Sequence, residues 1–295
     1  MMIVVSLSSK VNLPCRANKE KKQENLHMSG MDLDIGIKGF QRGTNIRDIV
    51  VPEHLRRKAT CGISWIDEAM GGRGFTPSTC GMLTGTPGAG KTTLLMQLAD
   101  SITRTGNVCL FNTGEESLHQ VAMTSERLKL SHGFTAGQDI YVPDLLQYAD
   151  NIMAEEVVGK TRGSSNDPRT LFILVDSLQT MNDGKYKDGG TTGATPKRVA
   201  KMFTEYTKDK KDVVLLFIGQ VTKSGEFSGQ NVIKHMIDMH LHLYIDDDKR
   251  SETWGERIFT NYKNRFGCAG RTYVLGMDES GLWKKGQFHP EERGK

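Results

Sequence analysis

From Thr60 onward the chain alternates short, nearly continuous apolar runs with longer stretches in which apolar residues recur at helical spacing. Apolar runs of this length, without polar alternation, are typical of strands that are covered on both faces. Their alternation with helices is typical of β/α units on a mainly parallel sheet. The predicted strands are Cys80–Thr84, Val108–Asn112, Leu171–Val175 and Val213–Ile218, and the predicted helices are Thr92–Arg104, Ser117–Leu130, Leu145–Gly159 and Lys197–Lys208.

After Gln220 the pattern changes to strand-like runs separated by turn residues, at His240–Ile245, Arg257–Tyr262 and Thr272–Met277. Strands joined by such short connections are antiparallel, so we expect them to extend the same sheet as hairpins. Because no internal repeat or long linker divides the chain, we predict one α/β domain over residues 46–285, with helices on both faces of the sheet. Residues 1–45 are predicted to be a poorly ordered tail, and residues 286–295 a short one.

Composition narrows the class of protein. Hydrophobic residues make up 37% and charged residues 25%, which suits a soluble globular protein. The net charge of +4 creates no strong basic field, so any nucleic-acid contact must come from a local patch. The five cysteines form no C-x-x-C pair, which argues against a zinc ribbon and a disulfide framework. No apolar run approaches the ~20 residues of a membrane helix, and we expect a cytoplasmic protein.

The segment Gly85–Thr92 matches the phosphate-binding pattern G-x-x-x-x-G-K-[ST] without a mismatch, between a predicted strand and a predicted helix. Glycines let backbone N–H groups surround the phosphates of ATP, and the helix N-terminus adds partial positive charge. In this motif Lys91 reaches the β- and γ-phosphates, and Thr92 offers its hydroxyl to Mg²⁺. The predicted nucleotide-binding residues are Gly85, Thr86, Pro87, Gly88, Ala89, Gly90, Lys91, Thr92 and Thr93.

Three further positions complete a hydrolytic site. Asp176 ends an apolar strand and is predicted to hold Mg²⁺ together with Thr92. Glu115 follows the strand Val108–Asn112, where a carboxylate can orient the attacking water. The adjacent Glu116 is the alternative, since one of the two glutamates also suits the acidic start of a helix. Gln220 ends another apolar strand, where loss of the γ-phosphate could be sensed.

Several strings in this order resemble the RadA (Sms) family of bacterial DNA-repair ATPases, which have a RecA-like P-loop core. The strings are Cys61-Gly-Ile-Ser-Trp-Ile-Asp67, Thr113-Gly-Glu-Glu-Ser117, Asp176-Ser-Leu-Gln-Thr180, Gly219-Gln-Val-Thr-Lys223, His235-Met-Ile-Asp238 and Lys263-Asn-Arg-Phe-Gly267. The resemblance covers about Thr60 to Trp283. Since neither the family's zinc ribbon nor its Lon-like domain is found, it implies the core domain alone.

The resemblance also implies a mechanism and partners. Such proteins form rings, here expected to be hexamers, in which Lys263 and Arg265 would act on the nucleotide of the adjacent copy. Loops after the strands that end at Asp176 and Gln220 would contact single-stranded DNA without sequence specificity, through phosphates and stacked bases. The predicted DNA-binding residues are Lys185, Lys187, Lys197, Arg198 and Lys223.

The leading hypothesis is therefore a Mg²⁺- and DNA-dependent ATPase that acts in recombination and repair, as a ring motor in branch migration, with a recombinase as a further partner. Two alternatives remain open at this stage. One is the core of a DnaB-like replicative helicase, and the other is a KaiC-like ATPase in which ATP occupancy controls a partner protein.

Overall fold

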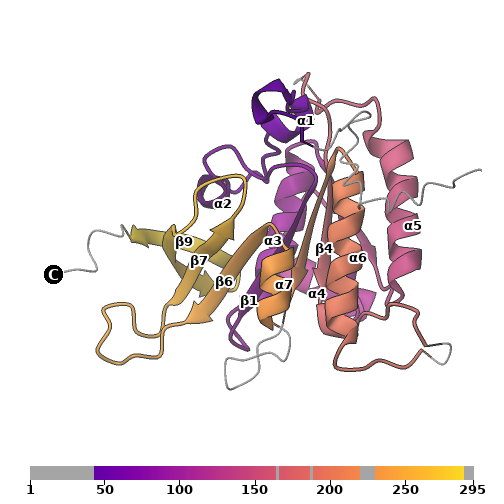
Figure 1. Cartoon of the computed structure of the whole chain (residues 1–295). Coiled ribbons are helices and arrows are strands. Elements are labelled where there is room, and N and C mark those ends of the chain that lie inside the picture. The colour runs from indigo at the N-terminus through magenta and orange to yellow at the C-terminus, as the bar shows by residue number, and fades with distance from the viewer. Residues whose placement is uncertain (1–42, 164–165, 187–188, 220–229, 289–295) are drawn as a thin grey trace, which may run out of the picture.

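We describe a computed structural model of the chain, covering residues 43–163, 166–186, 189–219 and 230–288. Its centre is a nine-stranded sheet in the order β3-β2-β4-β5-β1-β6-β7-β8-β9 (Figure 1). The strands are β1 Thr79–Gly85, β2 Val108–Thr113, β3 Thr135–Gly137, β4 Leu171–Asp176, β5 Val213–Ile218, β6 Met239–Ile245, β7 Arg257–Asn264, β8 Thr272–Asp278 and β9 Gly281–Phe288.

Helices lie on both faces of this sheet. They are α1 Glu53–Arg56, α2 Ser64–Ala69, α3 Lys91–Arg104, α4 Leu118–Arg127, α5 Val142–Ile152, α6 Thr195–Asp209 and α7 Gln230–Met236, with short 3₁₀ or π turns at Ile46–Asp48, Met153–Val157 and Leu178–Thr180. Helices α2, α3 and α4 close one hydrophobic core against the sheet, and α5, α6 and α7 close a second core on the opposite face.

In the parallel half of the sheet, the sequence pattern predicted β1, β2, β4 and β5. Strand β6 was expected to be antiparallel, but it pairs in parallel with β1 and antiparallel only with β7, because the chain crosses over through α7 before β6 begins. Every residue of β1, β4 and β5 is buried, because helices cover both faces of these strands. In α4, Ser117 and Gln120 form a reciprocal capping box that fixes where the helix begins. In α5, a proline in the first turn serves the same purpose.

The antiparallel half, β6 to β9, packs on α2. The Trp65 ring lies 5.0 Å from that of Phe259 on β7 and 5.7 Å from that of Tyr273 on β8, measured between centroids. Asp67 accepts hydrogen bonds from the backbone of Cys61 and the hydroxyl of Thr60, which folds the segment before α2 onto the helix. This explains physically why the string Cys61–Asp67 carries a tryptophan and an aspartate.

The predicted fold class is confirmed, since the sheet is mainly parallel and ends in antiparallel strands. The structure adds β3, β9, α1, α2 and α7, which the pattern did not predict. β3 has only three residues, and β9 is a largely polar edge strand that runs on to Phe288. Helix α5 ends at Ile152 and continues as a π turn to Val157, where a helix to Gly159 was expected.

Candidate active site

The phosphate cradle begins where β1 ends. Gly88 and Gly90 have φ values of 75° and 100°, in the left-handed region that favours glycine. At Gly85 a β-carbon would lie 1.7 Å from the carbonyl oxygen of Leu243 on β6, so only glycine fits there. The loop then turns directly into α3, whose first residue is Lys91. The backbone N–H groups of the first turn of α3 therefore face the loop, as phosphate binding requires.

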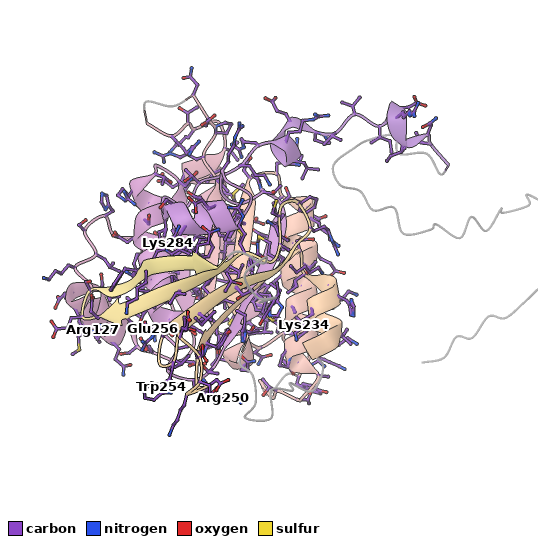
Figure 2. The ribbon with its side chains drawn as sticks, turned by 90° about the vertical axis from the view of Figure 1, so that its left-hand side faces the viewer. Arg127, Lys234, Arg250, Trp254, Glu256 and Lys284 are labelled. Carbon is purple, nitrogen blue, oxygen red and sulfur yellow. The ribbon has the colours of Figure 1, made fainter. Side chains whose placement is uncertain are left out.

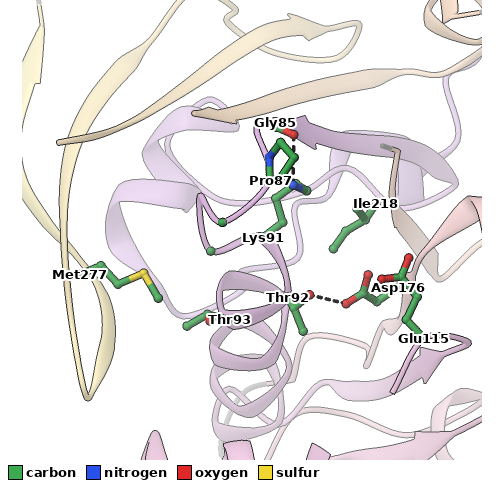
Figure 3. Close-up of a pocket in the computed structure, with 11 residues that line it drawn as sticks. Gly85, Pro87, Lys91, Thr92, Thr93, Glu115, Asp176, Ile218 and Met277 are labelled. Atoms are coloured by element: carbon green, nitrogen blue, oxygen red, sulfur yellow. Dashed lines mark hydrogen bonds between the residues drawn. The ribbon is translucent and has the colours of Figure 1, made fainter. Parts of the chain in front are cut away.

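Lys91 lies over the loop that precedes it (Figure 3). Its ammonium group donates to the carbonyl oxygens of Gly85, at 3.0 Å, and Thr86, at 2.9 Å. Burial lowers the pKa of Lys91, while the nearby carboxylates of Asp176 and Glu115 oppose this effect. The lysine is thus positioned at the mouth of the cradle with acidic groups close by.

Asp176 and Thr92 meet across the cavity. The Thr92 hydroxyl donates to Oδ2 of Asp176 at 2.5 Å, although the two residues are 84 positions apart in the sequence. Burial raises the pKa of Asp176 to about 6, against the opposing effect of the Thr92 hydrogen bond. A hydroxyl and a carboxylate are hard oxygen ligands, so this pair fits a magnesium ion that keeps several of its waters.

Glu115 is the second carboxylate in the cavity. Thr113 at the end of β2 pairs with Asp176 at the end of β4, which brings the segment after β2 beside Asp176. The Ser177 hydroxyl donates to Oε1 of Glu115 at 2.5 Å. Glu115 lines the cavity and Glu116 is not among the lining residues, so the geometry favours Glu115 for the role that the sequence left between them.

These groups share one cavity of about 480 Å³ (Figure 3). Ile218 at the end of β5 and Met277 on β8 also line it, and sequence reasoning identified neither. Apolar residues at strand ends carry no distinguishing signal in a sequence. The full lining is Gly85, Pro87, Gly88, Gly90, Lys91, Thr92, Thr93, Glu115, Asp176, Ile218 and Met277.

Lys263 and Arg265 lie at the other end of the sheet. Asn264, which lies between them, pairs with Met239 on β6. Met239 in turn pairs with Gly81 on β1, which lies four residues before Gly85. At about 3.3 Å per residue, the cradle is roughly 13 Å further along the strand. Neither residue lines the cavity.

Both cations are held by groups around α7. The Lys263 ammonium donates to the carbonyl oxygens of Lys234, at 2.7 Å, and Ile237, at 2.6 Å. The Arg265 guanidinium is 2.9 Å from Asp238, which is buried and also accepts from the backbone N–H of Cys80. These contacts fix the β7–β8 turn against α7.

The predicted DNA-binding residues on the first loop follow β4. Arg198, in the first turns of α6, forms an ion pair with Asp183, which is 5% exposed. The ammonium of Lys185 and the guanidinium of Arg198 lie 5.6 Å and 5.9 Å from the centroid of the Tyr186 ring. Lys197 is on the same helix. The predicted residues Lys187, Gln220 and Lys223 lie outside the described part of the chain.

With this geometry established, a family model described as "ATPase: KaiC" matches residues 59–265. The chain belongs to this ATPase family. In the part of the chain that the structure describes, no helix is both long and apolar enough to span a bilayer.

Individual relatives refine the comparison. The DNA repair protein RadA of Haemophilus influenzae is 33% identical, over 75% of this chain and 43% of that protein. RadA of Escherichia coli is 31% identical, over 84% of this chain and 48% of that protein. The resemblance to the RadA core is therefore confirmed, and the chain spans less than half the length of these relatives.

A solved structure of an ATPase domain from another protein matches with a TM-score of 0.63 at 13% identity, over 77% of this chain and 90% of that one. At this identity the match supports the fold alone. The family match thus confirms the predicted ATPase core, and the structural match supports its predicted fold.

Proposed function

We propose that this ATPase acts on single-stranded DNA as a ring of identical copies, a RadA-type motor core in DNA recombination and repair. One observation carries the proposal: Lys263 and Arg265 lie about 13 Å along the sheet from the cradle of their own chain. If these cations contribute to hydrolysis, they do so at the cradle of another copy.

Within one copy, the cradle's own residues have distinct tasks. The backbone amides around Gly88 and the Lys91 ammonium bind the phosphates, and Thr92 with Asp176 would hold magnesium. The metal, when bound, neutralises charge on the β- and γ-phosphates. Glu115, hydrogen-bonded to Ser177, orients the attacking water.

The neighbouring copy supplies the remaining charge. An arginine provided across an interface accelerates phosphoryl transfer by about 10³–10⁵. For Arg265 to act in this way, the ring must bring the β7–β8 turn of one copy to the cradle of the next. Single-stranded DNA is expected on the loops after β4 and β5. After β4, Lys185 and Tyr186 on the loop and Lys197 on α6 could supply phosphate contacts and stacking.

A mixing experiment tests the shared site. Lys91→Ala destroys the cradle and leaves the turn intact, while Arg265→Ala does the reverse. Each variant alone should hydrolyse ATP at background rate. An equal mixture should recover activity, because roughly a quarter of the interfaces in a random ring then pair an intact cradle with an intact arginine. If the ATP turnover of the mixture never exceeds the summed turnover of the two variants measured alone, action between copies is refuted.

DNA dependence needs its own test. ATP turnover by the unmodified chain should rise on addition of single-stranded DNA and should rise less at high salt, because phosphate contacts are screened. Turnover that ignores DNA, with no retention of DNA at low salt, would contradict the proposal. That result would favour a KaiC-like switch, an interpretation for which the family match gives independent support.

A further inference from the structure

Two residues beside Glu115 do not line the cavity but contact each other behind it: Gly114, which directly precedes Glu115, and Thr180, in the turn after β4. Both are half-buried. Their surroundings differ from those of exposed side chains such as Arg250 and Trp254, which point into solvent from the loop between β6 and β7 (Figure 2). The contact between Gly114 and Thr180 therefore joins two parts of the fold next to a cavity carboxylate.

Thr180 fills the space that a side chain at position 114 would need. A β-carbon on Gly114 would lie 2.2 Å from Oγ1 of Thr180 and 2.7 Å from its β-carbon, whereas the next atom, on Ile140, would be 3.4 Å away. Since β-carbons do not approach other atoms more closely than about 3 Å, only glycine fits while Thr180 is present. The backbone N–H of Gly114 also donates to the carbonyl oxygen of Asp176 at 2.9 Å. The segment after β2 is thus seated on the segment after β4.

The Thr180 hydroxyl makes a second connection to Glu115. It donates to the carbonyl oxygen of Ser177 at 2.8 Å, and the Ser177 hydroxyl donates to Oε1 of Glu115 at 2.5 Å. Ser177 is fully buried, so its orientation depends on the groups that it touches. A carboxylate that orients water needs a defined direction, which hydrogen bonds from supporting residues provide.

The backbone at Glu115 is also fixed from the side of β2. The Oγ1 atom of Thr113, a buried residue, accepts from the backbone N–H groups of Glu115, at 3.3 Å, and Glu116, at 3.1 Å. Figure 3 shows the result, with the side chain of Glu115 next to that of Asp176. Glu115 is therefore held between the end of β2 and the turn that contains Thr180.

We propose that Thr180 is a positioning residue for Glu115. Its side chain seats the segment after β2 by packing on Gly114, and its hydroxyl orients Ser177 toward the carboxylate. The inference rests on the proposed role of Glu115 in orienting water. Because Thr180 does not line the cavity, it acts on ATP turnover through Glu115 and leaves ATP affinity unchanged.

Steady-state ATP turnover and ATP titration test the role of the hydroxyl. Thr180→Val keeps a branched side chain of similar size and should lower kcat about tenfold, with ATP affinity unchanged, because the bond to Ser177 is lost. Thr180→Ser keeps the hydroxyl and should stay within about twofold of the unmodified chain. Thr103→Val is the matched control, since the half-buried Thr103 also donates to a backbone carbonyl, that of Ala99, without lining the cavity.

Two double variants separate positioning from a general loss of structure. Thr180→Val in the Glu115→Gln background should lower turnover no further, because the group that it positions is already gone. Gly114→Ala should lower kcat on the order of 10²-fold, since the new β-carbon pushes the two segments apart. Combined with Thr180→Gly, which removes the atoms that this β-carbon would meet, Gly114→Ala should cause no further loss.

Each outcome bears on the inference. ATP affinity equal to that of the unmodified chain shows that the cradle of a variant is folded. If Thr180→Val then turns over ATP at the unmodified rate, or lowers turnover equally in the Glu115→Gln background, Thr180 does not position Glu115. If Thr180→Val loses ATP affinity, the residue supports the fold as a whole and the inference is again wrong. If Glu115→Gln itself leaves turnover unchanged, the proposed role of Glu115 fails first.

Discussion

At the carboxyl ends of β1, β2 and β4, side chains from separate parts of the sequence converge on one cavity, whereas at the opposite end Lys263 and Arg265 are bonded to groups around α7. The first region contains the phosphate-binding motif and the oxygen groups of Thr92, Asp176 and Glu115, for which we propose magnesium binding and water orientation. The second has two cations that do not line this cavity. If Lys263 and Arg265 act on the ATP of a neighbouring copy, as we propose, ATP binding and full catalysis depend on different regions, and four experiments test this.

The largest expected effect is that of Arg265→Ala. We expect the ATP turnover of the assembled protein to fall about 10³–10⁵-fold, because the charge supplied to the neighbour's phosphate is lost. ATP affinity of the dilute chain, measured by titration, should stay unchanged, since Arg265 is remote from its own cradle. Arg250→Ala, at a highly exposed loop position, is the control. A matching loss of ATP affinity would show that the two regions are not separable.

Glu115→Gln is the corresponding change in the cavity. Removal of the group that orients water should lower turnover about 10²–10⁴-fold while ATP still binds. Glu116→Gln should have little effect, because Glu116 does not line the cavity. Steady-state ATP turnover and ATP titration of both variants measure these effects. A larger loss of turnover in Glu116→Gln than in Glu115→Gln would assign the role to Glu116.

Asp176→Asn should separate stability from activity. Burial raises the pKa of Asp176 from 3.8 to about 6, so the folded chain holds this proton more tightly than the unfolded chain. The resulting stabilisation is present below about pH 4 and is lost as the pH rises through 6. Without metal, the variant should therefore be about 1–3 kcal/mol more stable than the unmodified chain at pH 7–8.

Denaturant unfolding with EDTA at pH 4 and pH 8 measures this difference, which should vanish at pH 4. With magnesium and ATP the order should reverse, because only the unmodified chain keeps its carboxylate ligand. If the variant and the unmodified chain have equal free energies of unfolding at pH 8 without metal, burial of the ionised Asp176 does not destabilise the fold.

The smallest expected effect concerns Gln97, which ties α3 to the turn between β8 and β9. Its side chain bonds the carbonyl oxygens of Ser280 and Leu282 and the backbone N–H of Leu282. Gln97→Ala should cost about 1–2 kcal/mol and should increase hydrogen exchange in β9 more than in β4. Uniform exchange across the sheet would show that the antiparallel half does not open separately.

Much of the parallel half could be predicted from sequence because its signals are local. A strand buried on both faces is apolar along its length, and the glycines and lysine of the cradle stand at a spacing set by phosphate geometry. Asp176 and Glu115 became candidates because Asp176 directly follows the predicted strand Leu171–Val175 and Glu115 lies three residues after the predicted strand Val108–Asn112. Their mutual placement follows from parallel pairing, which brings the ends of β2 and β4 to the same edge.

The features that sequence reasoning missed depend on contacts between distant residues. β9 can be polar because it lies at the edge of the sheet and pairs with only one other strand, β8. β3 has three residues, which is too short for a periodic pattern. Met277 lines the cavity from β8, a strand whose turn to β9 is bonded to α3 through Gln97. The contacts of His240 with Thr84 and Tyr262 need the pairing of β6 with both β1 and β7, which no spacing between residues 84, 240 and 262 reveals.

The amino-acid sequence alone therefore determined that this chain has a phosphate-binding motif and that a mainly parallel sheet carries it, since both depend on patterns of residues near one another in the chain. Only the tertiary structure decided where the basic turn lies relative to that cradle. That distance depends on the register of β1, β6 and β7, which is set by packing across the whole sheet and not by any local pattern.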